Sequence, residues 1–340
     1  MSTPVQTPEP SPVLIFQTLN AFQQTAALKA AIEVDLFTAI GEGNSTADKL
    51  ALRCQTSERG IRILCDYLTV LGFLSKADFH YRLTPDSATF LDQRSPACIA
   101  SAVNFLTAPP MTDAFKDLTA VVRRGGTVLS EHGSMEPENP VWVEFARSMA
   151  PMMRMPAELI ADLLKAESSE RWKVLDIAAG HGLFGIAIAR RNPNAQIVAV
   201  DWPSVLEVAK ENAQAAGLDG RYGTIPGSAF DVDFGTGFDL VLLTNFLHHF
   251  DPPTCEKLLR KVHAALRPGG RTVTLEFVPN EDRVSPPPAA TFSMIMLGTT
   301  PSGDAYTFPE FEQMFQHAGF SRSELHPLRP TFEHVIISHK

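Results

Sequence analysis

The sequence is poor in cysteine, in positive charge and in long apolar runs, and each shortage excludes a class of protein. Its cysteines lack metal-ligand spacing, so we expect reduced thiols and no metal site; they are Cys54, Cys65, Cys98 and Cys255. Lys and Arg number 29 against 38 Asp and Glu, and the net charge of −9 gives no general attraction for nucleic acid. No apolar run is long enough to span a membrane, which argues against a membrane protein.

The N-terminal residues also lack two features of a signal peptide. Residues 1–12 contain neither a basic region nor an apolar stretch, so we expect a disordered leader and a cytoplasmic protein. With 340 residues, of which 44% are hydrophobic and 20% charged, the chain can bury a large core and is expected to form two domains. This composition favours an enzyme over a small binding module, with small molecules as its partners.

The first hundred residues predict a mainly helical domain. Apolar residues recur at mixed helical spacings, and residues 46–51 and 58–71 predict two further helices, the second stopped by Gly72. Two short strands, at residues 73–74 and 81–84, would then form a wing. The apolar residues of the first helical segment are Leu14, Phe16, Leu19, Phe22, Leu28, Ile32 and Leu36.

A winged helix in isolation suggests DNA binding, so two roles compete for this domain. A recognition helix presents basic residues to phosphates. Arg59 and Arg62 are present, but Glu58 and Asp66 share their helix and no basic cluster surrounds them. We therefore favour packing or dimerisation over DNA recognition.

A cofactor-binding segment follows in the second half of the chain. Residues 174–177 predict a buried strand, and Gly180 and Gly182 let the backbone of the next loop approach a ligand closely. A second strand ends in Asp201, whose carboxylate can accept both hydroxyls of a ribose. This arrangement predicts a nucleoside-bearing cofactor, and the glycine spacing alone leaves a dinucleotide open.

The segments downstream favour one cofactor. Residues 238–243 predict an apolar strand that is followed by Asn245-Phe246-Leu247-His248-His249-Phe250, and Pro268-Gly269-Gly270 precedes a strand at residues 272–276. This series resembles the S-adenosylmethionine-dependent methyltransferases. Together with the winged helix, it resembles the small-molecule O-methyltransferases of plants and bacteria that dimerise through an N-terminal domain.

The resemblance implies a fold, a domain order and an assembly. The expected fold is an α/β Rossmann-like methyltransferase sheet, mostly parallel, with an antiparallel C-terminal hairpin formed by residues 323–328 and 333–338. The expected domains are a leader at 1–12, a winged-helix dimerisation domain at 13–100, linking helices at 101–165 and a catalytic domain at 166–340. A homodimer is implied by the resemblance.

The resemblance also implies the residues that bind the cofactor, S-adenosylmethionine. Asp201 matches the acid that binds the ribose, and Trp202 the residue near adenine. Ser228 stands where the family has an aspartate, and a serine hydroxyl cannot form the charge-assisted bond of a carboxylate. Asp176 can anchor the glycine loop through backbone amides rather than contact the cofactor. The side chain of His181, in the same loop, can face solvent. The full set is Asp176, Gly180, Gly182, Asp201, Trp202, Ser228, Ala229, Phe230 and Thr244.

The resemblance implies that His248 is the general base and that Glu276 holds its ring. Histidine has an ordinary pKa of about 6.5, so it can take a phenolic proton near neutral pH as the new bond forms. We expect His249 to be structural and Asp251 to cap a helix that begins with two prolines. A second family acid is missing because Ala305 occupies its position, which leaves Asp304 or Tyr306 as substitutes.

Apolar side chains predict the acceptor pocket. Soft thioethers adapt to flat rings, which suits a planar and mostly apolar acceptor. Trp142 and Met153 share the helical spacing of these residues, but we interpret both as ordinary core. The expected acceptor residues are Phe145, Met149, Met152, Phe292, Ile295 and Met296.

These observations lead to one main hypothesis and two alternatives. The main hypothesis is an S-adenosylmethionine-dependent O-methyltransferase of secondary metabolism that acts on a phenolic or other aromatic hydroxyl of a small metabolite. The first alternative is methyl transfer to carbon or nitrogen on the same scaffold. The second is a winged-helix regulator that senses a ligand without catalysis.

Overall fold

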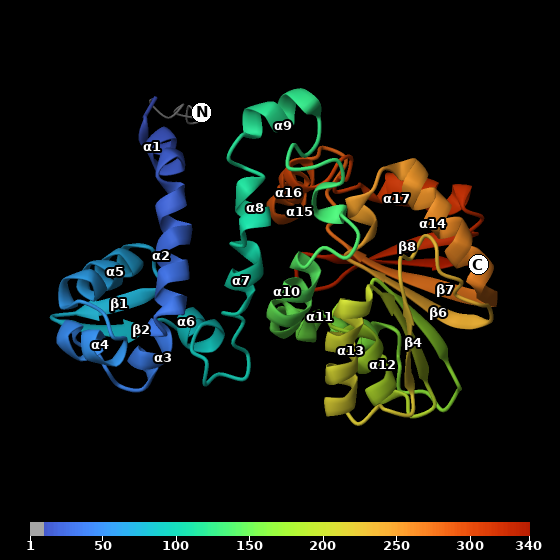
Figure 1. Ribbon diagram of the computed structural model, residues 1–340, viewed down its shortest axis with the longest axis horizontal. Helices are drawn as coiled ribbons and strands as arrows, with labels where there is room; N and C mark the ends of the chain where they lie inside the picture. Colours follow the sequence, from blue (N-terminus) through green and yellow to red (C-terminus); the bar gives the residue numbers. More distant parts are fainter. Residues whose placement is uncertain (1–9) are drawn as a thin grey trace, which may run out of the picture. The chain divides into compact units, whose positions relative to one another are not determined.

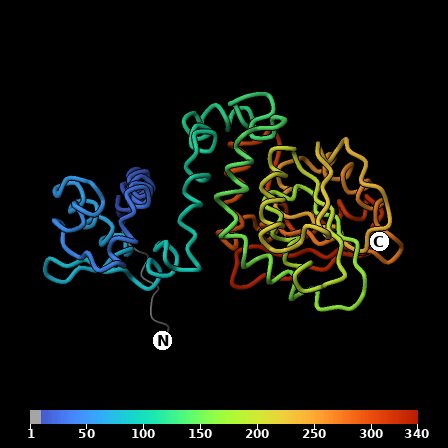
Figure 2. Tube along the Cα trace, turned by 60° about the horizontal axis from the view of Figure 1, so that its bottom comes forward, coloured from blue at the N-terminus to red at the C-terminus, as the bar shows by residue number. Residues whose placement is uncertain are grey.

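The computed structural model describes residues 10–340, and the chain divides into two units that meet between Val103 and Asn104. Each unit is one continuous stretch of chain, as the colours in Figure 2 show. Of the leader expected at residues 1–12, all but the last three positions lie outside the described residues. Within residues 10–340, no helix combines the length and the apolar character needed to cross a bilayer.

The first unit contains the predicted helices and the predicted wing. Ser57 caps the helix that carries Arg59 and Arg62, because its hydroxyl accepts a hydrogen bond from the backbone N–H of Gly60 at 3.1 Å. The two strands of the wing pair antiparallel. The elements are α1 (Val13–Leu19), α2 (Ala21–Glu33), α3 (Leu36–Gly41), α4 (Ala47–Arg53), α5 (Glu58–Val70), β1 (Leu74–Ala77), β2 (His80–Leu83) and α6 (Pro85–Phe90).

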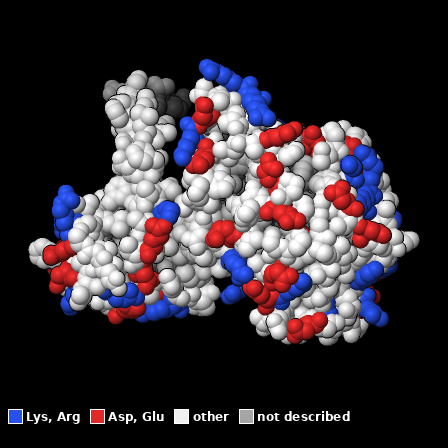
Figure 3. All heavy atoms as spheres, viewed as in Figure 1, with Lys and Arg blue, Asp and Glu red and all other residues white. Residues whose placement is uncertain are grey.

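The apolar residues at the start of this unit are not in its own core, so of the two roles expected for this domain, packing or dimerisation, they are available for dimerisation. Helix α1 buries none of its residues, and the side chains of Phe16 and Phe22 are 61% and 69% exposed. Leu14 and Leu19 are equally open, whereas Leu36 is fully buried. Residues 10–28 also contain no charged side chain, and Figure 3 shows this segment as an uncharged surface over α1 and the start of α2.

Short helices lead from the first unit into the second. Prolines begin α8 and stand inside α11, where Pro156 removes a backbone donor from the helical ladder. The elements are α7 (Ala102–Leu106), α8 (Pro109–Asp113), α9 (Leu118–Arg124), the 3₁₀ turn η1 (Gly133–Met135), α10 (Val141–Ser148) and α11 (Ala150–Leu163).

A seven-stranded sheet forms the centre of the second unit within the described residues, in the order β5-β4-β3-β6-β7-β9-β8. The first five strands in this order are parallel, and β9 and β8 run antiparallel as the C-terminal hairpin, so the predicted fold class is confirmed. The strands are β3 (Lys173–Ile177), β4 (Gln196–Asp201), β5 (Tyr222–Pro226), β6 (Phe238–Thr244), β7 (Leu266–Glu276), β8 (Arg322–Pro327) and β9 (His334–His339).

Helices cover both faces of this sheet, with α10 to α13 on one face and α14 and α17 on the other (Figure 1). Strands covered on both faces read as nearly continuous apolar runs, as in Leu240–Leu243, which are all at most 2% exposed. The remaining elements are α12 (Leu183–Arg191), α13 (Pro203–Ala215), the 3₁₀ turn η2 (Leu247–His249), α14 (Pro252–Ala265), α15 (Pro287–Ala290), α16 (Phe292–Thr299) and α17 (Phe308–His317).

The Pro-Gly-Gly segment differs from its prediction. We expected a turn before a strand at residues 272–276, but β7 already begins at Leu266 and includes this segment. The register with β6 shifts between Phe238 and Leu240, and Gly269 adopts a positive φ of 74°, so the segment is an irregularity inside the strand. The carboxyl ends of β3, β4, β6 and β7 still meet at one edge, where ligands of such sheets bind.

Candidate active site

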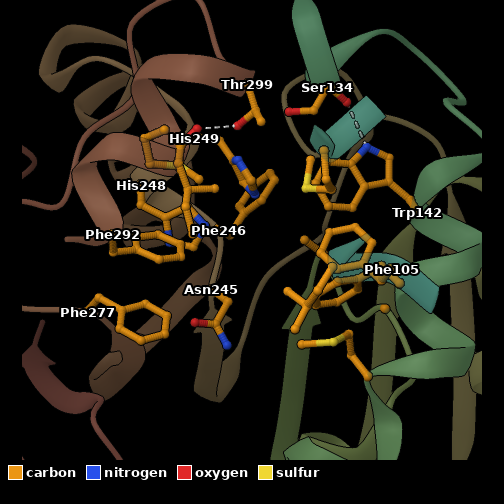
Figure 4. A pocket seen from close by; sticks show the side chains of 18 of the residues that line it. Phe105, Ser134, Trp142, Asn245, Phe246, His248, His249, Phe277, Phe292 and Thr299 are labelled. Atoms are coloured by element: carbon orange, nitrogen blue, oxygen red, sulfur yellow. Dashed lines mark hydrogen bonds between the residues drawn. The ribbon is translucent and has the colours of Figure 1, made fainter. Parts of the chain in front are cut away.

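A cavity of about 590 Å³ lies at this edge of the second unit. Its wall includes Gly180, Asp201 and Thr244 from the strand ends and His248 from the turn η2. Figure 4 shows the labelled aromatic side chains and His249 facing one another across the space. The cavity therefore combines a polar end at the strand termini with a larger aromatic end.

The polar end is shaped by an unusual backbone. Ala178 and Gly180 both adopt positive φ, at 54° and 56°, so the loop after β3 turns sharply. Asp201 fixes this loop, because its carboxylate accepts hydrogen bonds from the backbone N–H groups of Gly180 at 2.8 Å and Trp202 at 2.7 Å. Burial raises the pKa of Asp201 to about 6.

This end fits the nucleoside part of the predicted cofactor. An acid that closes the second strand beside a glycine loop is the arrangement that accepts ribose hydroxyls, and each oxygen of Asp201 keeps a lone pair for that purpose. A side chain at Gly180 would occupy this space, since its Cβ would lie 3.6 Å from the Phe145 ring. Ala178, Gly180, Asp201, Trp202 and Thr244 line the cavity and are the residues that would hold the cofactor.

The other predicted cofactor residues do not line the cavity. Asp176 is fully buried, and its carboxylate accepts the backbone N–H of Gly185 at 3.1 Å in helix α12. Burial raises its pKa to about 8. The Ser228 hydroxyl accepts the N–H of Phe230 at 3.2 Å in its own turn. Contact of Asp176, Gly182, Ser228, Ala229 and Phe230 with the cofactor thus stays a prediction.

His248 and Glu276 meet at the carboxyl ends of β6 and β7. The Nδ1 atom of His248 lies 2.5 Å from Oε2 of Glu276, which leaves Nε2 as the nitrogen available to a ligand. The other oxygen of Glu276 accepts backbone N–H groups of Phe246, Leu247 and His248 at 3.2, 2.9 and 3.4 Å. Glu276 therefore shapes the turn that carries the histidine as well as orienting its ring, and no feature of the sequence indicated the first role.

No second acid reaches His248 from the segment in which one was expected. The Tyr306 hydroxyl donates to the backbone carbonyl of Phe250 at 2.6 Å, and Asp304 forms an ion pair with Arg283 at 3.3 Å. Ala305 between them is fully buried. Both candidate substitutes are engaged elsewhere, so Glu276 is the acid that binds this histidine.

The aromatic end contains every residue predicted for the acceptor pocket. Trp142 and Met153 also line it, which corrects their interpretation as ordinary core. The Phe292 ring stacks on Phe277 at 4.2 Å between centroids and meets His248 edge-on at 4.8 Å. Phe105 and Phe277 also line the cavity and were missed, because tertiary packing decides which of several neighbouring apolar side chains faces it.

Two histidines and one aspartate complete the site. His181 is 2% exposed and its ring accepts the N–H of Leu183 at 3.2 Å, which excludes the alternative that it faces solvent; burial lowers its pKa to about 4. His249 lies in the cavity wall next to His248. Asp251 caps α14 as predicted, accepting the N–H of Thr254 at 2.9 Å.

Comparisons with known proteins agree with this geometry. The family model of an O-methyltransferase domain matches residues 115–321, and that of an O-methyltransferase dimerisation domain matches residues 16–93. The 3-hydroxy-5-methyl-1-naphthoate 3-O-methyltransferase of Streptomyces sahachiroi is 30% identical over 91% of this chain and 90% of its own length.

Solved structures give the same result. A crystal structure from Nostoc punctiforme, assigned as an O-methyltransferase, is 57% identical with a TM-score of 0.95 and covers 97% of this chain and 100% of its own. Human N-acetylserotonin methyltransferase in complex with S-adenosylmethionine is 21% identical, covers 99% of both chains and has a TM-score of 0.84, which shows the shared fold.

Proposed function

The chain belongs to the O-methyltransferase family and uses S-adenosylmethionine, and from this premise we propose that it methylates a phenolic hydroxyl of a small aromatic metabolite with His248 as general base. The observation that carries the proposal is His248 in the wall of an aromatic cavity, with its Nδ1 held by the buried Glu276. When bound, the cofactor supplies a methyl group on a positively charged sulfur.

The roles of the residues follow from their contacts. Glu276 at Nδ1 of His248 selects the tautomer with a free Nε2, which can take the phenolic proton as the bond to the methyl carbon forms. The carboxylate then stabilises the imidazolium. Phe292 and Phe277 confine a flat ring next to this nitrogen, and Asp201 at the polar end holds the cofactor ribose. Holding both reactants in line contributes as much as the base.

The test is the variant His248→Ala, assayed with labelled S-adenosylmethionine and a panel of phenols. We expect turnover to fall by about 10²- to 10⁴-fold while the dissociation constant of the cofactor stays unchanged. His317→Ala, which removes a half-exposed histidine of α17, is the matched control and should keep full activity. Full activity of His248→Ala would remove this residue as the base, and a product methylated on carbon or nitrogen would replace the proposed reaction.

We further propose that the exposed apolar face of α1 and α2 is covered by a second copy of the chain. Phe16 and Phe22 project from a segment without charge, and this segment falls largely in the region that matches the dimerisation domain. The double variant Phe16→Glu and Phe22→Glu should sediment as a monomer, because charges cannot be buried there without partners. Phe79→Glu, in the wing turn, is the control, and a double variant that stays dimeric would contradict the proposal.

A further inference from the structure

Two polar side chains in the wall of the aromatic end have no partner. Nδ1 of His249 and the hydroxyl of Ser134 are buried, and neither forms a hydrogen bond within the described residues. His249 is 8% exposed and Ser134 is 5% exposed. Burying a polar atom without a hydrogen-bond partner is unfavourable, and a ligand with hydrogen-bonding groups would satisfy two such atoms at one end of a cavity.

The two side chains belong to one arrangement. The ring of His249 meets that of Trp142 edge-on at 5.3 Å between centroids, and Nε1 of Trp142 donates to the backbone carbonyl of Ser134 at 3.0 Å. Figure 4 shows His249, Ser134 and Thr299 together at one end of the pocket, with Asn245 at the other. The Thr299 hydroxyl donates to the carbonyl of Ile295 at 2.7 Å, so its proton is already committed.

We propose that His249 and Ser134 form a polar corner that binds a second, uncharged hydrogen-bonding group of the acceptor, a hydroxyl or a carbonyl on the same ring system as the methylated hydroxyl. This inference rests on the proposed function and names the acceptor class more closely. A neutral imidazole offers one donor and one acceptor, and a serine hydroxyl offers both, so either group finds a partner there.

The charge of the wall restricts the acceptor further. Among the described residues that line the cavity there is no Lys or Arg, and the one carboxylate, Asp201, belongs to the polar end. Burial, together with the neighbouring His248, lowers the pKa of His249 well below its ordinary value, so this ring stays neutral. A carboxylate on the acceptor would lose its hydration here without gaining a cationic side chain of the protein, and acidic acceptors should therefore bind more weakly than neutral ones.

The test is a set of binding measurements by calorimetry, with S-adenosylhomocysteine present so that no turnover occurs. The probes are a naphthol, a series of dihydroxynaphthalenes that differ in the position of the second hydroxyl, and a hydroxynaphthoic acid. We expect at least one dihydroxy isomer to bind about three- to tenfold more tightly than the naphthol, the range of one or two neutral hydrogen bonds. The hydroxynaphthoic acid should bind more weakly than the naphthol.

Two variants test whether His249 and Ser134 cause the preference for a dihydroxynaphthalene over the naphthol. Ser134→Ala removes only an oxygen atom, and His249→Phe keeps a ring of similar size. Each should reduce the preference for the dihydroxy isomer to within about twofold while the affinity for the naphthol is kept. Thr274→Val is the matched control, because it removes a buried and unpartnered hydroxyl from β7 outside the cavity wall and should leave the preference intact.

The outcomes separate this inference from the proposed function. If the naphthol binds and is methylated but no dihydroxy isomer is preferred, or if both variants keep the preference, the polar corner is overturned and the proposed function stands. Tighter binding of the hydroxynaphthoic acid than of the naphthol would overturn the neutral acceptor. If no naphthol binds at all, the aromatic acceptor class and this inference fall together.

Discussion

The polar and aromatic ends of the cavity are built in different ways. The polar end consists of residues between Ala178 and Trp202, joined by Thr244, and depends on backbone φ angles and on one carboxylate that binds two backbone amides. The aromatic end gathers side chains from segments as far apart as Phe105 and Phe332. The difference teaches that the donor site is sensitive to single atoms, whereas the acceptor site can change in shape and specificity while cofactor binding persists.

The largest effect is expected where the two ends meet, from Glu276→Gln. A glutamine oxygen can still accept the N–H groups of the 246–248 turn, but its NH₂ group then faces Nδ1 of His248. Nδ1 must become the acceptor, Nε2 carries the proton, and the base is blocked. We expect turnover to fall by about 10³-fold with an unchanged cofactor dissociation constant, measured by single-turnover assay and calorimetry.

Loss of cofactor binding in the same variant would contradict the separation of the polar and aromatic ends. That result would mean that the turn shaped by Glu276 supports the polar end, and that the two ends fold as one. The solvent-exposed Glu324→Gln, in β8, is a suitable control for loss of a carboxylate. Retention of more than about a tenth of wild-type turnover in Glu276→Gln would instead contradict the orienting role.

The next effect concerns stability near the aromatic end, where Glu333 is buried and one of its oxygens lacks a partner. Burial raises its pKa from 4.5 to about 7, with Asn245 opposing the shift and Glu276 adding to it. The contribution of Glu333 to the free energy of unfolding is therefore fully present below pH 4.5 and is lost as the pH rises through about 7.

Glu333→Gln should therefore remove a penalty that appears only at high pH. Between pH 5 and pH 8 the variant should gain roughly 2–3 kcal/mol in free energy of unfolding relative to the wild type, measured by denaturant titration at each pH. Asp176 and Asp201 titrate in both proteins, so their contributions cancel in this difference. Parallel pH profiles of the two proteins would show that Glu333 is ionised without cost.

The sequence located both ends of the cavity, but it did not identify the full set of lining side chains, for a physical reason. Strand periodicity and the positions of Gly180 and Asp201 are local signals, so the cofactor-binding edge follows from residues 174–201, whereas the fold class needed the resemblance carried by the segments downstream. The roles of Trp142 and Phe105 in the wall depend on tertiary packing, which apolar spacing alone does not encode. The three amides that bind Glu276 depend in the same way on how the ends of two strands meet.

The exposed start of α1 is a second feature that apolar spacing alone could not explain. Its apolar spacing predicts a packed face, and the partner that we propose for it is a second copy of the chain rather than the unit's own core. Periodicity therefore identifies that a surface is to be buried, but not by which molecule. The same reasoning applies to Ser134 and His249, whose burial becomes informative only when their missing partners are known.

A smaller effect is expected at the polar end, from the pH dependence of cofactor affinity. Asp201 has a pKa of about 6 and must be ionised to accept ribose hydroxyls, so affinity is lost as the pH falls through this value. From pH 7 to pH 5 the dissociation constant should rise by about tenfold in the wild type. Asp201→Asn should bind about ten- to thirtyfold more weakly at pH 7 and show no such dependence, as measured by calorimetry.

The affinity for the acceptor should depend on pH in a different way from the affinity for the cofactor. The polar corner is not expected to titrate together with Asp201, since burial and the neighbouring His248 lower the pKa of His249 well below its ordinary value. An acceptor dissociation constant that rose in parallel with that of the cofactor would mean that the acceptor site forms only after the cofactor is bound.

The smallest effect is expected from Trp142→Phe, which removes one hydrogen bond and keeps an aromatic ring in the wall. The carbonyl of Ser134 loses the indole N–H at 3.0 Å, and the segment that carries Ser134 is held less firmly over the pocket. We expect the affinity for a naphthol to fall by about threefold and the cofactor dissociation constant to stay within about twofold, both measured by calorimetry. Because the lost hydrogen bond lies at the aromatic end, a larger loss of affinity for the cofactor than for the naphthol would show that the two ends are not independent.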